Sequence, residues 1–165
     1  MNKKTICLMT LSMFVSFCGC HKLDSYKKDD NKAPKIYLYP MLQSEKSVVK
    51  DWESLKGKVV VLEFWATWCH ACDKSFNHMN KLAEGLEDKP VQFISITNEE
   101  THKIEEYIKT NPIKGWIGID EDNFTKRNFK ITAIPQIVVI DKEGKIAAKT
   151  FPTELQIDNI RALLN

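Results

Sequence analysis

Two cysteines three residues apart, Cys69 and Cys72, are the residues of this chain best suited to chemistry. They follow directly on an apolar run and open a segment with helical spacing, so their sulfurs share one helical face within reach of a disulfide. The start of a helix offers unpaired N–H groups and the positive end of the dipole, which favour a thiolate. Because only a thiolate attacks a disulfide, the pattern predicts Cys69 as the nucleophile and Cys72 as the resolving cysteine.

The elements that must position this pair alternate along the chain. We expect strands at 59–65, 91–96, 116–119, 137–140 and 145–150, the last two joined by a hairpin turn at 141–144. We expect helices from Cys69 to near Pro90, after a capping box at 97–100, at 123–129, and after a cap formed by Thr153 with Gln156. This order predicts an α/β fold whose central mixed sheet is flanked by helices.

Length and composition allow one compact domain. The chain has 165 residues, of which 43% are hydrophobic, and 24 basic residues stand against 22 acidic ones. A chain with this hydrophobic fraction can bury a core, which excludes an intrinsically disordered protein. The small net charge gives no support for nucleic-acid binding.

The first twenty residues have the pattern of an export signal. Lys3 and Lys4 precede fourteen uncharged residues that end at Cys18, a run shorter than the ~20 apolar residues of a membrane-spanning helix. The segment that ends in Gly19 and Cys20 resembles the lipobox of bacterial lipoproteins, which implies cleavage after residue 19 and a lipid on Cys20. The alternative is a signal anchor that stays uncut. Both predict a domain that is exported and held at a membrane.

The sequence after the signal divides into two parts. Half of the residues from His21 to Pro34 are charged, so residues 20–34 are predicted to be a flexible tether, and residues 35–165 the folded domain. Loss of the signal and lipidation of Cys20 would leave only Cys69 and Cys72 as free cysteines. A disulfide that closes so short a loop stabilises a fold very little, which favours a reactive role over a structural one.

Two motifs resemble those of the thioredoxin-like superfamily. Residues 63–72, Glu-Phe-Trp-Ala-Thr-Trp-Cys-His-Ala-Cys, look like its active-site segment, and Ile131-Thr132-Ala133-Ile134-Pro135 looks like its cis-proline loop. Residues 55–60 and an extra segment between Thr97 and Phe129 are more narrowly similar to membrane-tethered thiol–disulfide oxidoreductases of the TlpA/ResA type. The similarity covers about residues 47–165. It implies a thioredoxin-like fold with a TlpA-type insertion between the second strand and the cis-proline loop.

The resemblance also implies roles for individual residues. Cys69 matches the attacking and Cys72 the resolving cysteine, while Pro135 matches the cis-proline that faces the disulfide. The backbone of Ile134 would then bind a substrate strand. Glu63 stands where relatives carry a buried acid or amide, and a carboxylate there could accept the proton of Cys72. We interpret Trp68 as a wall of the site.

Two departures from the family pattern bear on the direction of electron flow. His70 and Ala71 stand between the cysteines where many relatives have Gly-Pro or Glu-Pro, and an imidazole beside Cys69 could stabilise its thiolate and make the pair more oxidising. Asp73, Lys74 and Ser75 replace the Glu and Pro that often follow in tethered reductases. We expect a reductase of cell-envelope protein disulfides, fed by a membrane thiol donor. A disulfide oxidase or isomerase is the alternative within the same chemistry.

Other interpretations remain open. A binding module without catalysis could use the same fold, Glu63 could be a carboxylate at a sheet edge, and Pro135 could be a trans proline of a turn. A zinc site would need four ligands, and the remaining mature candidates are the scattered His21, His70, His78 and His102. We therefore expect no metal, no other cofactor, no nucleic-acid partner, and a monomer.

Overall fold

The computed structural model describes residues 31–165 of the chain. The predicted signal (residues 1–19), the proposed lipidation site Cys20 and most of the predicted tether lie outside these residues. The described part contains six strands, four α-helices and two 3-10 helices. In chain order they are β1 (Met41–Leu42), η1 (Glu53–Leu55), β2 (Val59–Phe64), α1 (His70–Glu84), β3 (Val91–Thr97), α2 (Thr101–Ile108), β4 (Trp116–Ile119), α3 (Phe124–Asn128), β5 (Gln136–Ile140), β6 (Ile146–Thr150), η2 (Pro152–Glu154) and α4 (Ile157–Arg161).

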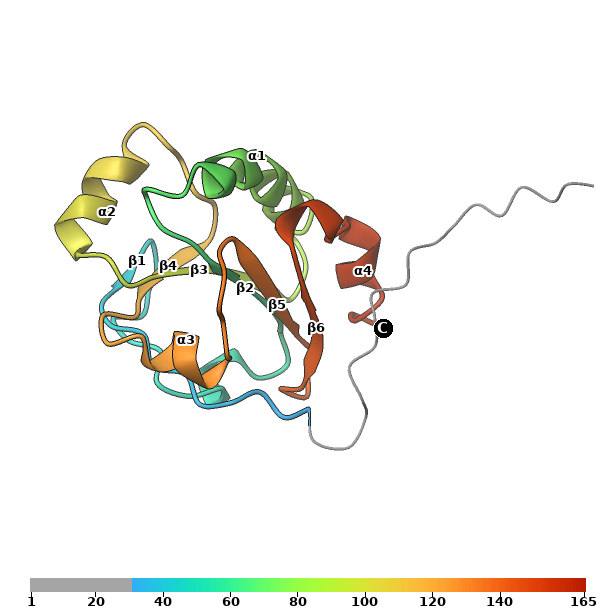
Figure 1. The fold of residues 1–165 in the computed structure, drawn as a ribbon. Coiled ribbons are helices and arrows are strands. Elements are labelled where there is room, and N and C mark those ends of the chain that lie inside the picture. Colours follow the sequence, from blue (N-terminus) through green and yellow to red (C-terminus); the bar gives the residue numbers. More distant parts are fainter. Residues whose placement is uncertain (1–30) are drawn as a thin grey trace, which may run out of the picture.

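All six strands belong to one mixed sheet in the order β1-β4-β3-β2-β5-β6 (Figure 1). Strands β2, β3 and β4 are parallel, whereas β5 pairs antiparallel with β2 and β6 antiparallel with β5. This confirms the predicted α/β fold with a mixed sheet. The elements α2, β4 and α3 lie between the second predicted strand, β3, and the proline loop, where the sequence predicts an insertion.

The central strand β2 is buried along its whole length, because helices and loops cover both faces of the sheet. Its side chains alternate between the faces. Val60, Leu62 and Phe64 join the cluster beneath α3 and the N-terminal segment, whereas Val59 and Val61 join the cluster beneath α1 and α4. By the same alternation Glu63 points to the α1 face, so a carboxylate enters the interior at the end of the strand that leads to the cysteines.

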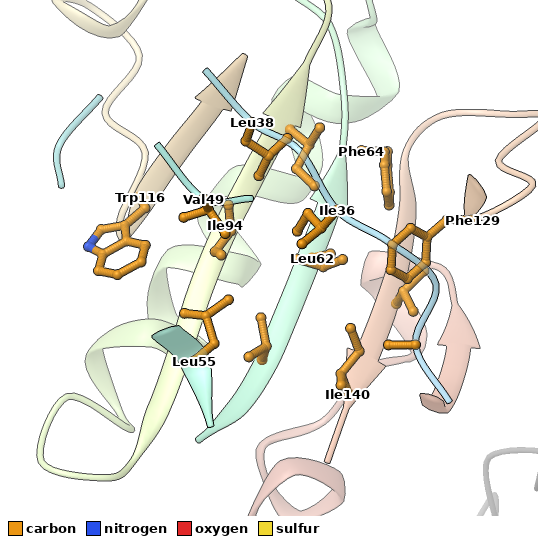
Figure 2. Packing of buried hydrophobic residues seen from close by; sticks show 14 of the residues in the cluster. Ile36, Leu38, Val49, Leu55, Leu62, Phe64, Ile94, Trp116, Phe129 and Ile140 are labelled. Carbon is orange, nitrogen blue, oxygen red and sulfur yellow. The ribbon is translucent and has the colours of Figure 1, made fainter. Parts of the chain in front are cut away.

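A segment that the sequence pattern does not predict as structured covers the other face. Residues 33–55 pass across the sheet, and their apolar side chains pack on those of the strands (Figure 2). Leu38 pairs with Val49 in an isolated bridge and lies against Gly118 of β4, where a Cβ atom would come within 2.6 Å of the Leu38 side chain. Residues 32 and 33, assigned to the tether on sequence grounds, also contact the fold: Lys32 bridges to Lys145, and the buried Ala33 donates its N–H to the carbonyl of Gly144.

The end of α1 and the start of α2 differ from the sequence-based expectation. Helix α1 ends at Glu84 rather than near Pro90, because the chain turns at Gly85, where Ile157 of α4 packs so closely that a Cβ atom would meet it at 2.8 Å. The capping box expected at 97–100 does not form. Thr97 ends β3, and helix α2 begins only at Thr101, with Glu100 as its N-cap.

The C-terminal helix is also shorter than expected. Thr153 lies in the 3-10 helix η2, and Gln156 caps α4 in reciprocal hydrogen bonds with Asn159. Leu155 precedes α4 while Leu163 and Leu164 follow it, yet all three pack on the cluster beneath α1. Burial of these leucines therefore does not require a continuous helix. Among residues 31–165, no helix has the length and apolar character needed to cross a membrane.

We predict that the N-terminal segment stabilises the domain through Leu38. Because this side chain is fully buried against β4, Leu38→Ala should lower the free energy of unfolding by about 2–5 kcal/mol. Tyr37→Ala, at the neighbouring position, is the matched control. The Tyr37 ring is half exposed, so the loss of unfolding free energy should stay within about 0.5 kcal/mol, as for other surface substitutions. Urea unfolding of both variants measures the difference. A loss within about 0.5 kcal/mol for Leu38→Ala as well would show that the segment is not part of the cooperative fold.

Candidate active site

Cys69 and Cys72 form a disulfide at the junction of β2 and α1, with their Cα atoms 5.2 Å apart. Cys69 is the N-cap of α1, and its sulfur accepts the backbone N–H of Cys72 at 3.2 Å. Cys69 is 7% exposed whereas Cys72 is completely buried, so only Cys69 can be reached by a second molecule. The N–H of the first helical turn would stabilise negative charge on the same sulfur once the disulfide is reduced.

Glu63 lies on the sheet face beneath α1 and is 3% exposed. Its carboxylate accepts the hydroxyl proton of Ser75, with 2.9 Å between the oxygens. Burial raises the pKa of Glu63 from 4.5 to about 7, while the Ser75 hydrogen bond acts in the opposite direction. The group can therefore take up and release a proton near neutral pH. Its burial contradicts the alternative of an ordinary carboxylate at a sheet edge.

The sequence pattern did not indicate Ser75 as a functional residue. It is buried in the first turns of α1, and its oxygen also lies 2.8 Å from the carbonyl oxygen of Cys72. The available signal was its spacing: Ser75 follows Cys72 by three residues, so both lie on the buried face of one helix. A serine on that face can reach a carboxylate on the strand below.

Two further carboxylates fix the segment that carries Cys69. Glu99, in the loop before α2, accepts the backbone N–H of Thr67 at 2.6 Å and its hydroxyl at 2.8 Å, and pairs with Lys103. Burial alone would raise the pKa of Glu99, but the hydrogen bonds from Lys103 and Thr67 outweigh it and hold that pKa below its ordinary value. The charged carboxylate thus ties the loop between β2 and α1 to the start of α2.

Asp73 forms the second tie. It accepts the phenol hydroxyl of Tyr107 on α2, and burial together with the Asp73 carboxylate raises the pKa of Tyr107. The tyrosine therefore stays protonated and remains a donor. Its ring lies beside Trp65, which packs edge-on against Phe76 with ring centroids 5.0 Å apart. The indole nitrogen of Trp65 is buried without a hydrogen-bond partner among residues 31–165.

The side chain of His70 is 98% exposed and extends into solvent from the start of α1. Its Nδ1 lies 3.7 Å from the carboxylate of Asp73, one helical turn further on. The imidazole is therefore paired with an acid on its own helix. Any effect of His70 on the thiolate of Cys69 stays a prediction.

The peptide bond between Ile134 and Pro135 is cis, and both residues lie directly before β5, whose pairing with β2 begins at Gln136. Ile134 and Trp68, the residue before Cys69, line a small hollow of about 20 Å³, and Trp68 is 68% exposed. Polar side chains complete the lining. They come from the loops after β3 and β4 and from α3, namely Asn98, Asp120, Asn123 and Lys126. The structure thus brings together Glu63, Trp68, Cys69, Cys72, Ile134 and Pro135 around the carboxyl end of β2. Within the described residues, no group of three or more His, Cys, Asp or Glu side chains could hold a metal ion.

Comparison with known families decides between the possible kinds of protein. The model of the Redoxin family matches residues 28–164. The chain belongs to the Redoxin family. Among curated Redoxin-like relatives, it is 31% identical over 127 residues to thiol-disulfide oxidoreductase ResA of Bacillus cereus, covering 76% of this chain and 72% of the relative. It is also 30% identical over 156 residues to thioredoxin-like protein YneN of Bacillus subtilis, covering 88% of both chains.

Solved structures of thiol–disulfide oxidoreductases share the fold of this Redoxin-family chain. A structure from Chlorobium tepidum, named for the thiol:disulfide interchange protein DsbE, superposes with a TM-score of 0.72 at 25% identity, covering 87% of this chain and all of the other. The thioredoxin domain of a thiol-disulfide oxidoreductase from Bacteroides vulgatus shares the fold, with a TM-score of 0.65 at 24% identity over 81% of this chain and 96% of that one. The fold is thioredoxin-like, and the protein is a thiol–disulfide oxidoreductase of this family.

We predict that the buried carboxyl of Glu63 makes stability fall as the pH rises. Its pKa is raised from 4.5 to about 7 in the folded state, so folding favours the protonated form. Relative to Glu63→Gln, the oxidised wild type should be unaffected below pH 4.5 and lose about 3 kcal/mol of unfolding free energy between pH 4.5 and 7.

Urea unfolding of the oxidised proteins from pH 4 to 8 measures this difference. Glu45→Gln is the control, since this side chain is exposed and is therefore not desolvated in the folded protein. A flat difference for Glu63→Gln as well would show that Glu63 is not desolvated in solution.

Proposed function

We propose that this protein reduces protein disulfides in the cell envelope, with Cys69 as the attacking and Cys72 as the resolving cysteine. The observation that carries the proposal is the asymmetry of the pair. Cys69 is slightly exposed at the N-terminus of α1 and accepts an N–H of the first turn, whereas Cys72 is fully buried. A substrate disulfide can reach only one sulfur, and that sulfur is the one whose thiolate the helix stabilises.

The reaction runs in two exchanges. The thiolate of Cys69 attacks one sulfur of the substrate disulfide and releases the other substrate sulfur as a thiolate, leaving a mixed disulfide. Glu63 then accepts the proton of the Cys72 thiol, and the resulting thiolate attacks the sulfur of Cys69. The substrate leaves with its second thiolate, so the substrate has gained two electrons and Cys69–Cys72 has become a disulfide.

The surroundings of Ile134 and Trp68 support a peptide substrate. Ile134 lies one residue before the cis-proline and outside the ladder between β2 and β5, so its backbone groups are available to an extended strand. Trp68 lines the same hollow as Ile134 and provides an exposed apolar wall for such a strand. Backbone hydrogen bonds to such a strand would be independent of its sequence, which suits an enzyme that acts on several proteins.

The charges around the pair favour the reductive direction over the oxidase or isomerase alternative. Asp73 places a carboxylate in the first turn of α1, and His70 contacts this carboxylate with its Nδ1. A negative charge so near Cys69 opposes the thiolate and therefore destabilises the reduced form. The pair then gives up its electrons more readily than one in which the imidazole stabilises the thiolate.

The location rests on the sequence alone. Lys3, Lys4 and the apolar run to Cys18 support export, and Gly19 followed by Cys20 supports a lipid anchor. An oxidising envelope would leave Cys69–Cys72 as a disulfide, so a reductase there needs a membrane-bound thiol donor. The monomer and the absence of cofactors belong to the same proposal.

We predict that Cys72→Ser accumulates mixed disulfides with substrate proteins through Cys69. The first exchange still takes place, and the second cannot, because a hydroxyl in place of the resolving thiol provides no thiolate. Nonreducing electrophoresis of envelope proteins should show adducts with Cys72→Ser and none with Cys69→Ser. Adducts with neither variant would overturn the enzymatic proposal and favour a binding module; adducts with Cys69→Ser alone would reverse the two roles.

We predict a reduction potential near about −270 mV, the value of thioredoxin, rather than toward about −120 mV, that of a strong periplasmic oxidant. Equilibration against thiol buffers in detergent measures it on the full chain with Cys7→Ser, Cys18→Ser and Cys20→Ser, so that only Cys69 and Cys72 titrate. In the same background Asp73→Asn should move the potential upward. Asp51→Asn should not, because it removes an exposed carboxylate near the opposite end of β2. A potential near about −120 mV would reverse the direction.

A further inference from the structure

Ser75 joins the two buried groups of the site, and among residues 31–165 no other side chain is seen to do so. Its oxygen lies 2.9 Å from a carboxylate oxygen of Glu63 and 2.8 Å from the carbonyl oxygen of Cys72. A hydroxyl has one proton and therefore donates to only one of these two acceptors at a time. The protonation state of Glu63 decides which one.

We propose that Ser75 is a positioning residue for proton transfer, whose hydroxyl holds the Glu63 carboxyl against the first turn of α1 in both of its protonation states. This rests on the proposed function, in which Glu63 accepts the proton of Cys72. When Glu63 is ionised, Ser75 donates to it. When Glu63 is protonated, its own O–H donates to the Ser75 oxygen, and the Ser75 proton turns to the carbonyl of Cys72.

Both arrangements use the same heavy-atom positions. A buried carboxyl that loses its partner on changing its charge suffers a large desolvation penalty, and the side chain would have to move. With Ser75 beside it, only hydrogens are rearranged. The carboxyl therefore stays in place while the proton of the Cys72 thiol is transferred, with the S–H bond breaking and the Glu63 O–H bond forming.

The surroundings of Glu63 contain few other groups that could do this. On α1, Ser75 contacts Glu63 and also reaches the backbone carbonyl of the buried Cys72. Ile137 of β5 and Ser95 of β3 are the partners of Glu63 in the sheet. Glu63 also lines a cavity of about 10 Å³ together with Ser95, Asn80 and Lys114. The ammonium of Lys114 pairs with Glu84 at 3.4 Å, and the amide of Asn80 accepts the N–H of Lys114, so both are engaged elsewhere.

A serine on a helix commonly donates to the carbonyl three residues before it, and this alone would be a structural role. The two roles predict different results. A purely structural Ser75 affects the stability of α1 and leaves the titration of Glu63 unchanged. A positioning Ser75 changes that titration, because its hydrogen bond favours the ionised carboxyl.

The test is a carboxyl-carbon NMR titration of Glu63 in the oxidised full chain, with Cys7→Ser, Cys18→Ser and Cys20→Ser. Ser75→Ala should move the titration midpoint upward by about one pH unit, since one hydrogen bond to the charged form is lost. Ser75→Thr keeps the hydroxyl and should restore the midpoint. Ser95→Ala is the matched control, because Ser95 is a buried serine paired with Glu63 in the sheet and lies on the same cavity.

The release of substrate from the mixed disulfide gives an independent readout. At pH 6 the Ser75→Ala enzyme should resolve the mixed disulfide up to about tenfold more slowly, and the difference should shrink above pH 8. An unchanged midpoint and rate in Ser75→Ala would overturn the inference, while adducts with Cys72→Ser would still support the proposed function. A midpoint that moves equally in Ser95→Ala would also overturn it, because the effect would then come from cavity polarity and not from Ser75.

Discussion

The burial of one carboxyl group at the end of β2 constrains the whole arrangement around the cysteines. Glu63 occupies a position on the α1 face where the strand otherwise presents valines, and its desolvation is severe enough to keep it protonated up to about neutral pH. Such a group requires a hydrogen-bond partner in the interior. Ser75 provides it from the buried face of α1, the same face on which Cys72 lies.

The segment between β3 and β5 contributes to the site more directly than its place in the chain suggests. Glu99, before α2, holds Thr67, and Tyr107, on α2, holds Asp73. These two attachments lie on either side of Cys69, and each involves a charged carboxylate, which makes a stronger hydrogen bond than a neutral acceptor. The segment between β3 and β5 therefore holds both the loop before Cys69 and the first turn of α1. It also packs Tyr107 on Trp65, so the apolar wall behind the disulfide depends on it.

The parts of the fold that the sequence predicts are those with a strong local pattern. The apolar run at 59–64 predicts β2, and the Cys-x-x-Cys pair at a helix start predicts the disulfide, because both depend on neighbours a few residues apart. The segment 33–55 escapes prediction since Leu38 and Val49 are buried by contacts with strands far along the chain. The caps expected at Thr97 and Thr153 are wrong for a different, local reason. The Thr97 hydroxyl accepts the N–H of Glu99, and Gln156 forms a reciprocal capping box with Asn159.

The same distinction applies to the site. Cys69, Cys72, Pro135 and the burial of Glu63 follow from motifs. The roles of Ser75, Glu99 and Tyr107 become visible only when α1, β2 and α2 are placed in space. Each of these three residues makes its contact through a side chain of ordinary type at a position without a family pattern in the sequence. Each takes part in a hydrogen bond to a carboxylate near the cysteines. Ser75 donates to Glu63, Tyr107 donates to Asp73, and Glu99 accepts from Thr67. In this protein the cysteines define the chemistry, and the three carboxylates of Glu63, Asp73 and Glu99 determine the geometry and charge in which that chemistry takes place.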